Sequence, residues 1–191
     1  RLFLKAKENY VFPEQLKIPN AYAASYSDDD SKIAYNPNAP VFLQWKNYRG
    51  GTKSEVWIMK WKDYSVEKIP QPAEGCNDMS PMYVGGKIYF LSDRNGEFNL
   101  FSFDEKNSSI TQETKYADFP VLTFSTGDGK IIFEQAGTLH IYDASTKTIK
   151  DIKININPDL PNARSRFVKG NSYLRNAAIS PSGARAVFEM R

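Results

Sequence analysis

The chain has 191 residues, of which 41% are hydrophobic, 14% aromatic and 25% charged, with a formal net charge of +3. This composition is that of one folded domain and excludes an intrinsically disordered chain, and no stretch of the sequence approaches the roughly 20 apolar residues that a membrane-spanning helix needs. A disulfide framework within the chain is excluded because Cys76 is its only cysteine.

Short apolar strands separated by polar turns recur along the chain, whereas helical periodicity is nearly missing. Four strands open with a basic residue directly after a turn, and they are predicted at 32–35, 87–91, 130–134 and 185–189. One strand precedes each of them, at 23–26, 80–83, 121–124 and 176–179. Two strands follow each of the first three, at 55–59 and 66–69, at 99–104 and 110–113, and at 138–143 and 149–152.

The basic openings are 55, 43 and 55 residues apart, and a four-stranded unit that repeats every 40–55 residues or so is typical of β-propeller blades. A single four-stranded sheet has two apolar faces, which it buries only against neighbouring sheets. An immunoglobulin-like sandwich also has short strands and turns, but it does not predict spaced copies of one unit. We therefore predict an all-β fold of β-propeller blades, each with four antiparallel strands.

The predicted blades set the expected domain organisation, a single partial β-propeller over 1–191. It consists of a blade tail at 1–20, full blades at about 21–71, 76–115 and 120–154, and the start of a further blade at 172–191. A closed propeller has about 4–8 blades of roughly 40–45 residues each. Three full blades do not close a six-bladed ring, so we expect either that this sequence is part of something longer or that the missing blades lie in another chain.

Several segments carry a resemblance to known propeller families. The segment 87–101, with its Ser-Asp-Arg-Asn-Gly turn, resembles the repeat of TolB-type propellers. The segment 45–51, followed by Val-Trp-Ile at 56–58, resembles the W-x-x-Y-R-G-G…IWI stretch of the N-terminal propeller in the tricorn protease family. Three further segments match in that family's order, at 24–28, 77–83 and 179–188. One departure is the Asp-Asp-Asp turn at 28–30, where the family usually has Ser-Pro-Asp-Gly.

The resemblance to the tricorn protease family implies a function for a parent protein. It implies a large serine peptidase that degrades oligopeptides and carries a six-bladed propeller, a seven-bladed propeller, a PDZ-like module and C-terminal catalytic domains. The family's catalytic serine, histidine and glutamate belong to those C-terminal domains, so no catalytic residue is assigned in this chain. The resemblance also implies that the propellers frame routes by which peptides and products pass the catalytic chamber.

The expected role is therefore a non-catalytic propeller segment that acts as a substrate gate, channel or assembly domain in oligopeptide degradation. Expected partners are peptides or the remaining domains of the parent peptidase, which we expect to be a homo-oligomer, and no nucleic acid is expected. The resemblance implies a cytoplasmic location, while a periplasmic one stays open. The alternative is a stand-alone TolB-like propeller that serves as a protein–protein interaction module.

The segment 45–51 is also the strongest candidate for a binding site. Trp45, Tyr48 and Arg49 are its candidate peptide contacts, because arginine binds carboxylates through two hydrogen bonds and aromatic rings stack on side chains. The structural alternative is that this long insertion, which accounts for the spacing of 55 residues, caps the edge of its blade. If Arg49 binds peptide, Arg49→Ala is expected to leave folding intact and to weaken peptide binding.

Other polar residues favour structural roles. His140 is the only histidine and lies in an alternating strand, so we expect it to be packed inside its blade. One histidine and one cysteine make no ligand cluster for a metal, and neither a metal nor a cofactor is expected. The segment Asp93-Arg94 is expected to make a structural ion pair between strands.

Two charged segments have a functional alternative. Carboxylates at 28–30 and at Asp78 lie at turns, where a propeller glycosidase would carry its paired acids, but Asp and Asn at turns usually bond local main-chain amides. The segment 164–175 carries four basic residues and no acidic one, which makes it the best candidate for nucleic-acid binding. We expect a solvated loop there, because most surface charge is simply solvated.

Overall fold

The computed structural model of the chain describes residues 3–4, 14–18, 20–40 and 46–191. The chain divides into two compact units, Arg1–Lys153 and Ile154–Arg191, and each unit is considered by itself. In the described ranges no helix has the length and apolar character needed to cross a membrane.

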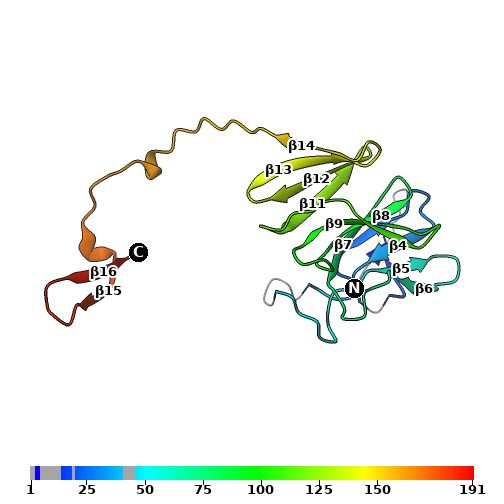
Figure 1. The fold of residues 1–191 in the computed structure, drawn as a ribbon, viewed down its shortest axis with the longest axis horizontal. Helices are drawn as coiled ribbons and strands as arrows, with labels where there is room; N and C mark the ends of the chain where they lie inside the picture. Colours follow the sequence, from blue (N-terminus) through cyan, green and yellow to red (C-terminus); the bar gives the residue numbers. More distant parts are fainter. Residues whose placement is uncertain (1–2, 5–13, 19, 41–45) are drawn as a thin grey trace. The chain divides into compact units, whose positions relative to one another are not determined.

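The first unit contains three four-stranded sheets, which we call blades 1, 2 and 3, and each pairs its strands antiparallel in chain order (Figure 1). Blade 1 consists of β3 (Ala24–Tyr26), β4 (Lys32–Tyr35), β5 (Trp57–Lys60) and β6 (Val66–Lys68). Blade 2 consists of β7 (Asp78–Val84), β8 (Lys87–Ser92), β9 (Asn99–Asp104) and β10 (Ser109–Gln112). Blade 3 consists of β11 (Val121–Gly127), β12 (Lys130–Gln135), β13 (Thr138–Asp143) and β14 (Thr148–Ile152).

These sheets confirm the predicted all-β fold, and β8 shows why its sequence is a continuous apolar run. Successive side chains point to opposite faces of a strand. Ile88 and Phe90 pack in one core with blade 1, whereas Tyr89 and Leu91 pack in another core with blade 3. Because blade 2 is covered on both faces, its inner strands need apolar residues at every position.

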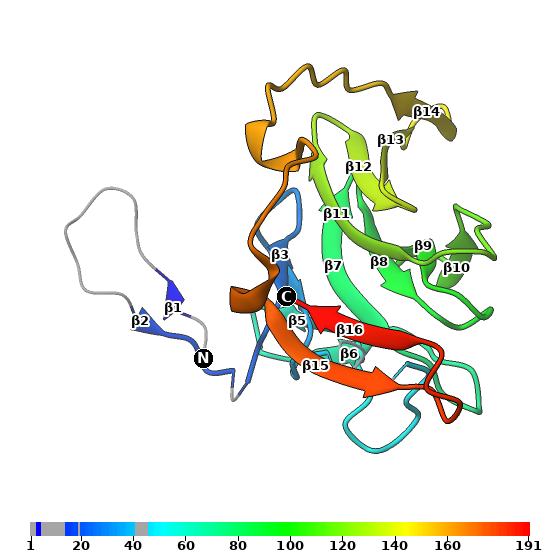
Figure 2. The same ribbon diagram turned by 90° about the vertical axis from the view of Figure 1, so that its left-hand side faces the viewer.

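The first strands of neighbouring blades lie next to one another. Both β3 and β11 contact β7, and Figure 2 shows β7 and β11 running side by side. Each first strand pairs with one strand only, since β3, β7 and β11 are end members of their sheets. The three sheets therefore meet along their first strands, as propeller blades do around their axis.

The connections differ between the two ends of the blades. One end carries tight hairpin turns, such as the turn at 128–129, where φ is positive at both residues (50° and 68°). This is the backbone of a two-residue hairpin turn. The opposite end carries the longer connections 36–56, 69–77 and 113–120. The candidate binding segment belongs to the first of these long connections.

The N-terminal part forms a small sheet of its own. β1 (Phe3–Leu4) pairs antiparallel with β2 (Glu14–Gln15). Directly after β2, Leu16 and Ile18 are buried in one core with residues of blade 1. The segment predicted as a blade tail at 1–20 thus contains a hairpin, and the residues after its second strand cover one face of blade 1.

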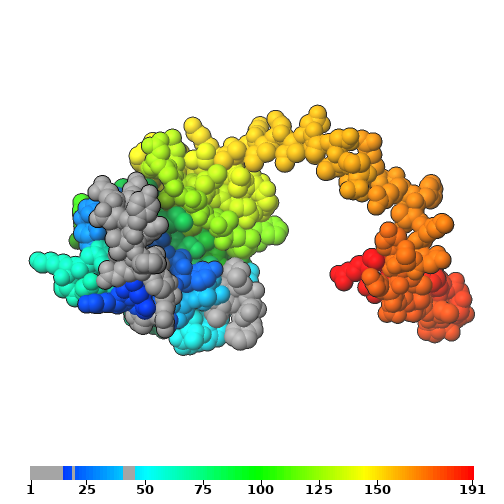
Figure 3. All heavy atoms as spheres, turned by 180° about the vertical axis from the view of Figure 1, so that it is seen from behind, coloured from blue at the N-terminus to red at the C-terminus, as the bar shows by residue number. Residues whose placement is uncertain are grey.

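The second unit contains one hairpin and two short 3-10 helices. The hairpin joins β15 (Leu174–Ile179) to β16 (Ala186–Met190), and the helices are η2 (Pro161–Ala163) and η3 (Gly170–Ser172). Most of its side chains are exposed, and Figure 3 shows the residues before η3 as an extended run in orange. The two strands match those predicted in this region, and their assignment to a further blade stays a prediction.

Candidate functional site

The connection that carries the candidate residues joins β4 to β5 within blade 1 and contacts blade 2. Trp45 lies outside the described residues, whereas Tyr48 and Arg49 lie within them. The Arg49 guanidinium donates through Nη1 to Asp93 Oδ2 at 2.7 Å. Asp93 follows β8 and is 1% exposed, while 33% of the Arg49 side chain is exposed. Arg49 therefore neutralises a buried carboxylate of the next blade.

Gly50 lets this connection turn tightly beside Tyr48. A Cβ atom at position 50 would overlap the Tyr48 phenol ring, so a residue with a side chain would displace the ring. The Tyr48 hydroxyl accepts a hydrogen bond from Thr52 Oγ1 at 3.1 Å. The main-chain carbonyl oxygen of Tyr48 accepts one from Asn77 Nδ2 at 2.9 Å. The turn is thus tied to blade 2 through its main chain as well as through Arg49.

Asn77 joins the same connection to Asp93. Its main-chain N–H donates to Asp93 Oδ1 at 2.7 Å, and its Nδ2 donates to Asp93 Oδ2 at 3.0 Å. Its Oδ1 accepts from the main-chain N–H of Ser54 at 3.2 Å. A buried charge needs such partners, because burial without them is strongly unfavourable. Asp93 therefore has an arginine and two amide donors around it.

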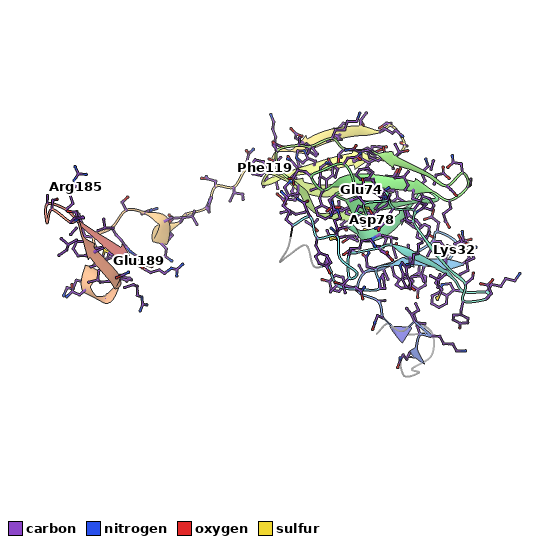
Figure 4. All side chains as sticks on the ribbon, turned by 60° about the horizontal axis from the view of Figure 1, so that its bottom comes forward. Lys32, Glu74, Asp78, Phe119, Arg185 and Glu189 are labelled. Carbon is purple, nitrogen blue, oxygen red and sulfur yellow. The ribbon has the colours of Figure 1, made fainter. Side chains whose placement is uncertain are left out.

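A second buried carboxylate belongs to Asp78, the first residue of β7. It is completely buried, and Figure 4 shows it among the interior side chains of the first unit. Arg94 Nη2 donates to its two oxygens at 3.0 and 3.1 Å, and Gln71 Nε2 donates at 3.0 Å. The Arg94 guanidinium also lies 5.3 Å from the ring centroids of Phe90 and Phe101. The aromatic faces add a favourable cation–π contact to the ion pair.

Asp93 and Arg94 each form a structural ion pair with a partner elsewhere in the fold. Consecutive side chains at the end of a strand diverge, since they point to opposite faces. Asp93 turns toward Arg49 of blade 1, and Arg94 turns back to Asp78 of its own blade. The result is two separate ion pairs, each with a buried aspartate.

Cys76 lies beside this network as a buried thiol. Its Sγ donates to Asp78 Oδ1 at 3.4 Å. Burial, and after it the negative charge of Asp78, raises the pKa of Cys76 to about 12. The thiol therefore stays protonated near neutral pH, and only the thiolate is a strong nucleophile. The geometry assigns Cys76 to packing.

Glu55 sits between two lysines on the outer side of the junction. Lys53 Nζ and Lys68 Nζ each donate to its carboxylate at 2.9 Å, and Trp57 Nε1 donates at 3.0 Å. Burial alone would raise the pKa of Glu55, but these three donors outweigh it and lower the pKa to about 2. A cleft of about 320 Å³ lies beside both lysines, and both cations are already paired with Glu55.

Asn36 is a buried polar residue that the sequence analysis does not single out. It is 3% exposed, and its Nδ2 donates to the carbonyl oxygens of Glu55 at 2.7 Å and Asp78 at 2.9 Å. Its Oδ1 accepts from the main-chain N–H of Ser80 at 2.8 Å. Asn36 thus connects the main chains of blades 1 and 2. The one signal in the sequence is an asparagine directly after an apolar strand, which does not reveal a partner 42 residues away.

His140 lies in β13 and is packed inside blade 3. Its ring stacks on Phe133 with 5.0 Å between centroids, and its Nδ1 lies 2.9 Å from Asp151 Oδ1. Its Nε2 is buried and has no hydrogen-bond partner among the described residues. Among all the residues that the structure describes, no group of three or more His, Cys, Asp and Glu side chains is placed to hold a metal ion.

The acidic turn at 28–30 makes structural hydrogen bonds. Asp29 accepts from the serine hydroxyls on either side of it at 2.7 and 2.8 Å, and these bonds lower its pKa to about 2. Asp28 accepts from the main-chain N–H of Gly86 in the turn after β7, at 2.8 Å. Asp78 lies at the opposite end of β7, so these acids do not form the pair that a glycosidase needs.

Comparison with known sequences identifies relatives of this chain. The sequence model of the family described as "Tricorn protease N-terminal beta propeller domain" matches residues 3–148. A tricorn protease homolog of Saccharolobus solfataricus is 32% identical over 164 residues, which cover 86% of this chain and 15% of that protein. The tricorn protease of Thermoplasma acidophilum is 29% identical over 139 residues, which cover 73% of this chain and 12% of that protein. The chain thus spans a small part of the length of these relatives.

Solved structures share the fold. The crystal structure of the tricorn protease superposes with a TM-score of 0.68 at 23% identity, over 87% of this chain and 16% of that chain. A TolB structure from Acinetobacter baumannii superposes with a TM-score of 0.51 at 20% identity, over 71% of this chain and 33% of that chain. At these identities the likeness shows the β-propeller fold alone.

Proposed function

Because this chain belongs to the tricorn protease family, through that family's N-terminal β-propeller domain, we propose that it forms a non-catalytic wall of a peptide route in a parent serine peptidase. The route leads oligopeptides or their products past the blades to or from a catalytic site elsewhere in that protein. The chain corresponds to 15% of one relative, so in this proposal the peptidase chemistry belongs to the remainder of a larger protein.

The observation that carries this proposal is the way charge is held at the junction of blades 1 and 2. Asp78 and Asp93 are almost completely buried, and each is bonded to an arginine and to neutral donors. The two charges of such a pair stay together, because a buried charge without its partner is unfavourable. Removing one partner costs about 3–5 kcal/mol. Charge pairs of this kind hold blades 1 and 2 in a fixed relative position, which supports their role as the wall of a peptide route.

Peptide contact by Trp45, Tyr48 and Arg49 is a further part of the proposal. Arg49 supports it because 33% of its side chain is exposed while Asp93 holds its Nη1, so the guanidinium is presented in one orientation. Arginine in such a position suits a peptide carboxylate or carbonyl. The buried partner also changes the expected effect of Arg49→Ala, which now includes a loss of stability at the junction.

The proposal is tested in the full-length protein by narrowing the route. Leu122 lies on the first strand of blade 3 and is 52% exposed, so Leu122→Cys accepts a bulky maleimide polymer. Cys76 does not compete for the label because it is buried and protonated, and any further reactive cysteines are replaced beforehand. We expect hydrolysis of a long unstructured peptide to fall by about tenfold, which corresponds to about 1.4 kcal/mol.

Lys150→Cys is the matched control for this experiment. Lys150 is exposed on β14, the fourth strand of the same blade. The same label at this position is expected to leave hydrolysis unchanged, because the fourth strand lies at the other end of the sheet from the first. Equal losses from both labels, or no loss from Leu122→Cys, contradict the proposed wall.

A further inference from the structure

The first strand of blade 3 has one edge without a paired strand. β11 pairs with β12 on one side, and β7 contacts β11 without joining its ladder. An unpaired edge presents main-chain N–H and C=O groups that another strand can bind. Whether this edge can bind a strand depends on which main-chain groups point outward and on whether the neighbouring blade already forms hydrogen bonds with them.

The hairpin turn decides which main-chain groups of β11 point outward. Residues 128–129 form a two-residue turn, which makes Gly127 and Lys130 a hydrogen-bonded pair. Antiparallel pairs then alternate between hydrogen-bonded and non-hydrogen-bonded. The main-chain groups of Thr126 and Phe124 therefore point away from β12, toward the free edge.

The corresponding edge of β7 is closed. The two-residue turn at 85–86 has the same form, and the same alternation turns the N–H of Tyr83 outward. That N–H donates to Ser25 Oγ of blade 1 at 3.1 Å. Pro81, in the same strand, has no N–H to donate. A side chain of blade 1 and a proline thus remove the donors from this edge.

The edge of β11 is open in the described part of the chain. None of the described residues accepts a hydrogen bond from the outward N–H of Phe124 or Thr126. β11 contains neither a charged residue nor a proline, whereas the outer strand β14 carries Lys150 and Asp151. Charges and prolines on an edge prevent further strands from pairing. Blade 3 has charges at its outer edge and none on its inner strand.

We propose that the free edge of β11 binds the main chain of an extended peptide by strand addition. Thr126 and Phe124 each offer an N–H and a C=O, and their spacing of two residues matches the repeat of a paired strand. Because the main chain is recognised, side-chain charge does not select the ligand, and the substrate class is extended oligopeptides of mixed sequence. This inference rests on the proposed role of the blades as the wall of a peptide route.

The test uses the full 191-residue chain and an acetylated, amidated peptide of alternating Thr and Val, roughly six residues long. NMR follows hydrogen exchange of single amides with and without this peptide. We expect exchange at Phe124 and Thr126 to slow by about tenfold, while exchange along β14 stays unchanged. The same peptide with an N-methyl group on every main-chain nitrogen cannot pair as a strand through either edge, and it is expected to leave every rate unchanged.

Two variants of Thr126 separate main-chain from side-chain effects. Thr126→Pro removes the outward N–H and is expected to abolish the slowing at Phe124, whereas Thr126→Val keeps the N–H and should retain the slowing. Absence of slowing in the unmodified chain, or slowing that persists with the N-methylated peptide, overturns the inference. Slowing that rises with protein concentration in the absence of peptide also overturns it, because a second copy of the chain then occupies the edge.

The inference and the proposed function fail separately. If the capped peptide slows exchange in β11 but the label at Leu122→Cys leaves hydrolysis unchanged, the proposed route fails and the peptide-binding edge stands. If the label blocks hydrolysis but the peptide slows no amide in β11, the edge fails as a binding site and the route stands.

Discussion

The junction between blades 1 and 2 and the junction between blades 2 and 3 each have an apolar core, and the first also has a buried network of charged and amide side chains. The first holds two buried carboxylates, each paired with an arginine, and two buried asparagines. The second is a core whose buried members include Met79, Leu91, Leu100, Val121, Phe124, Ile131 and Phe133. Its polar contacts include the Tyr142 hydroxyl, which donates to Glu113 at 2.5 Å.

The two kinds of contact have different effects: apolar burial holds the blades together, whereas a polar network fixes how they are placed. Apolar burial is non-directional and holds two sheets together over a range of side-chain arrangements. A buried polar network has one satisfied arrangement, because each donor needs its own acceptor. The polar network lies under the connection that carries Tyr48 and Arg49, so that connection is held in one position on blade 2.

The largest expected effect breaks the polar junction. Arg94→Met leaves Asp78 buried without its cation, and we expect the free energy of unfolding to fall by about 3–5 kcal/mol. Urea unfolding of the full chain measures this change. Lys62→Met, at an exposed lysine, is the matched control and should change stability by less than about 0.5 kcal/mol. A loss below about 1 kcal/mol for Arg94→Met would mean that the pair is not buried as described.

Substitutions that keep side-chain volume sharpen the comparison. Asp78→Asn keeps the shape but leaves Arg94 without a counter-charge, so we expect a loss of about 2–3 kcal/mol. Leu91→Met keeps the volume inside the apolar core, where the expected loss is below about 1.5 kcal/mol. Both are measured by the same urea titration. Equal losses would show that the two junctions do not differ in their tolerance.

The smallest expected effect is a pH dependence on the outer side of the polar junction. Folded Glu55 has a pKa of about 2 against an ordinary value of 4.5, so the unfolded chain binds the proton first as the pH falls. The stability that Glu55 contributes is present above about pH 4.5 and is lost as the pH falls toward 2.

Urea midpoints measured across this pH range test the assignment to Glu55. Glu55→Gln removes the titrating group, and we expect it to flatten the fall in stability between about pH 4.5 and 2. If the variant keeps the full slope of the original chain, other carboxylates cause the fall and the lysines around Glu55 contribute no pH-dependent stability.

The fold could be predicted because the blades repeat a local signal. The strand predicted at 87–91 is observed at Lys87–Ser92, since a sheet covered on both faces needs a continuous apolar run between two turns. The hairpin of β1 and β2 could not be predicted. Each of its strands has two residues, which is too short for a periodic pattern to show.

The candidate site could be predicted only in part. The sequence singles out Tyr48 and Arg49 because they belong to a short local motif, the segment 45–51, which ends in two glycines. It does not show that Asp93, 44 residues away, is the partner of Arg49, because such a contact depends on how neighbouring blades pack. Strand geometry turns Arg94, the sequence neighbour of Asp93, to the other side, where it pairs with Asp78.

A double-mutant cycle between Arg49 and Asp93 tests most directly whether charge fastens blade 1 to blade 2, because the two residues belong to different blades. Arg49→Met, Asp93→Asn and the double variant are compared by urea unfolding of the full chain. We expect a coupling free energy of about 1–3 kcal/mol, with the double variant losing less than the sum of the single ones. A coupling below about 0.5 kcal/mol would contradict a junction held by this pair.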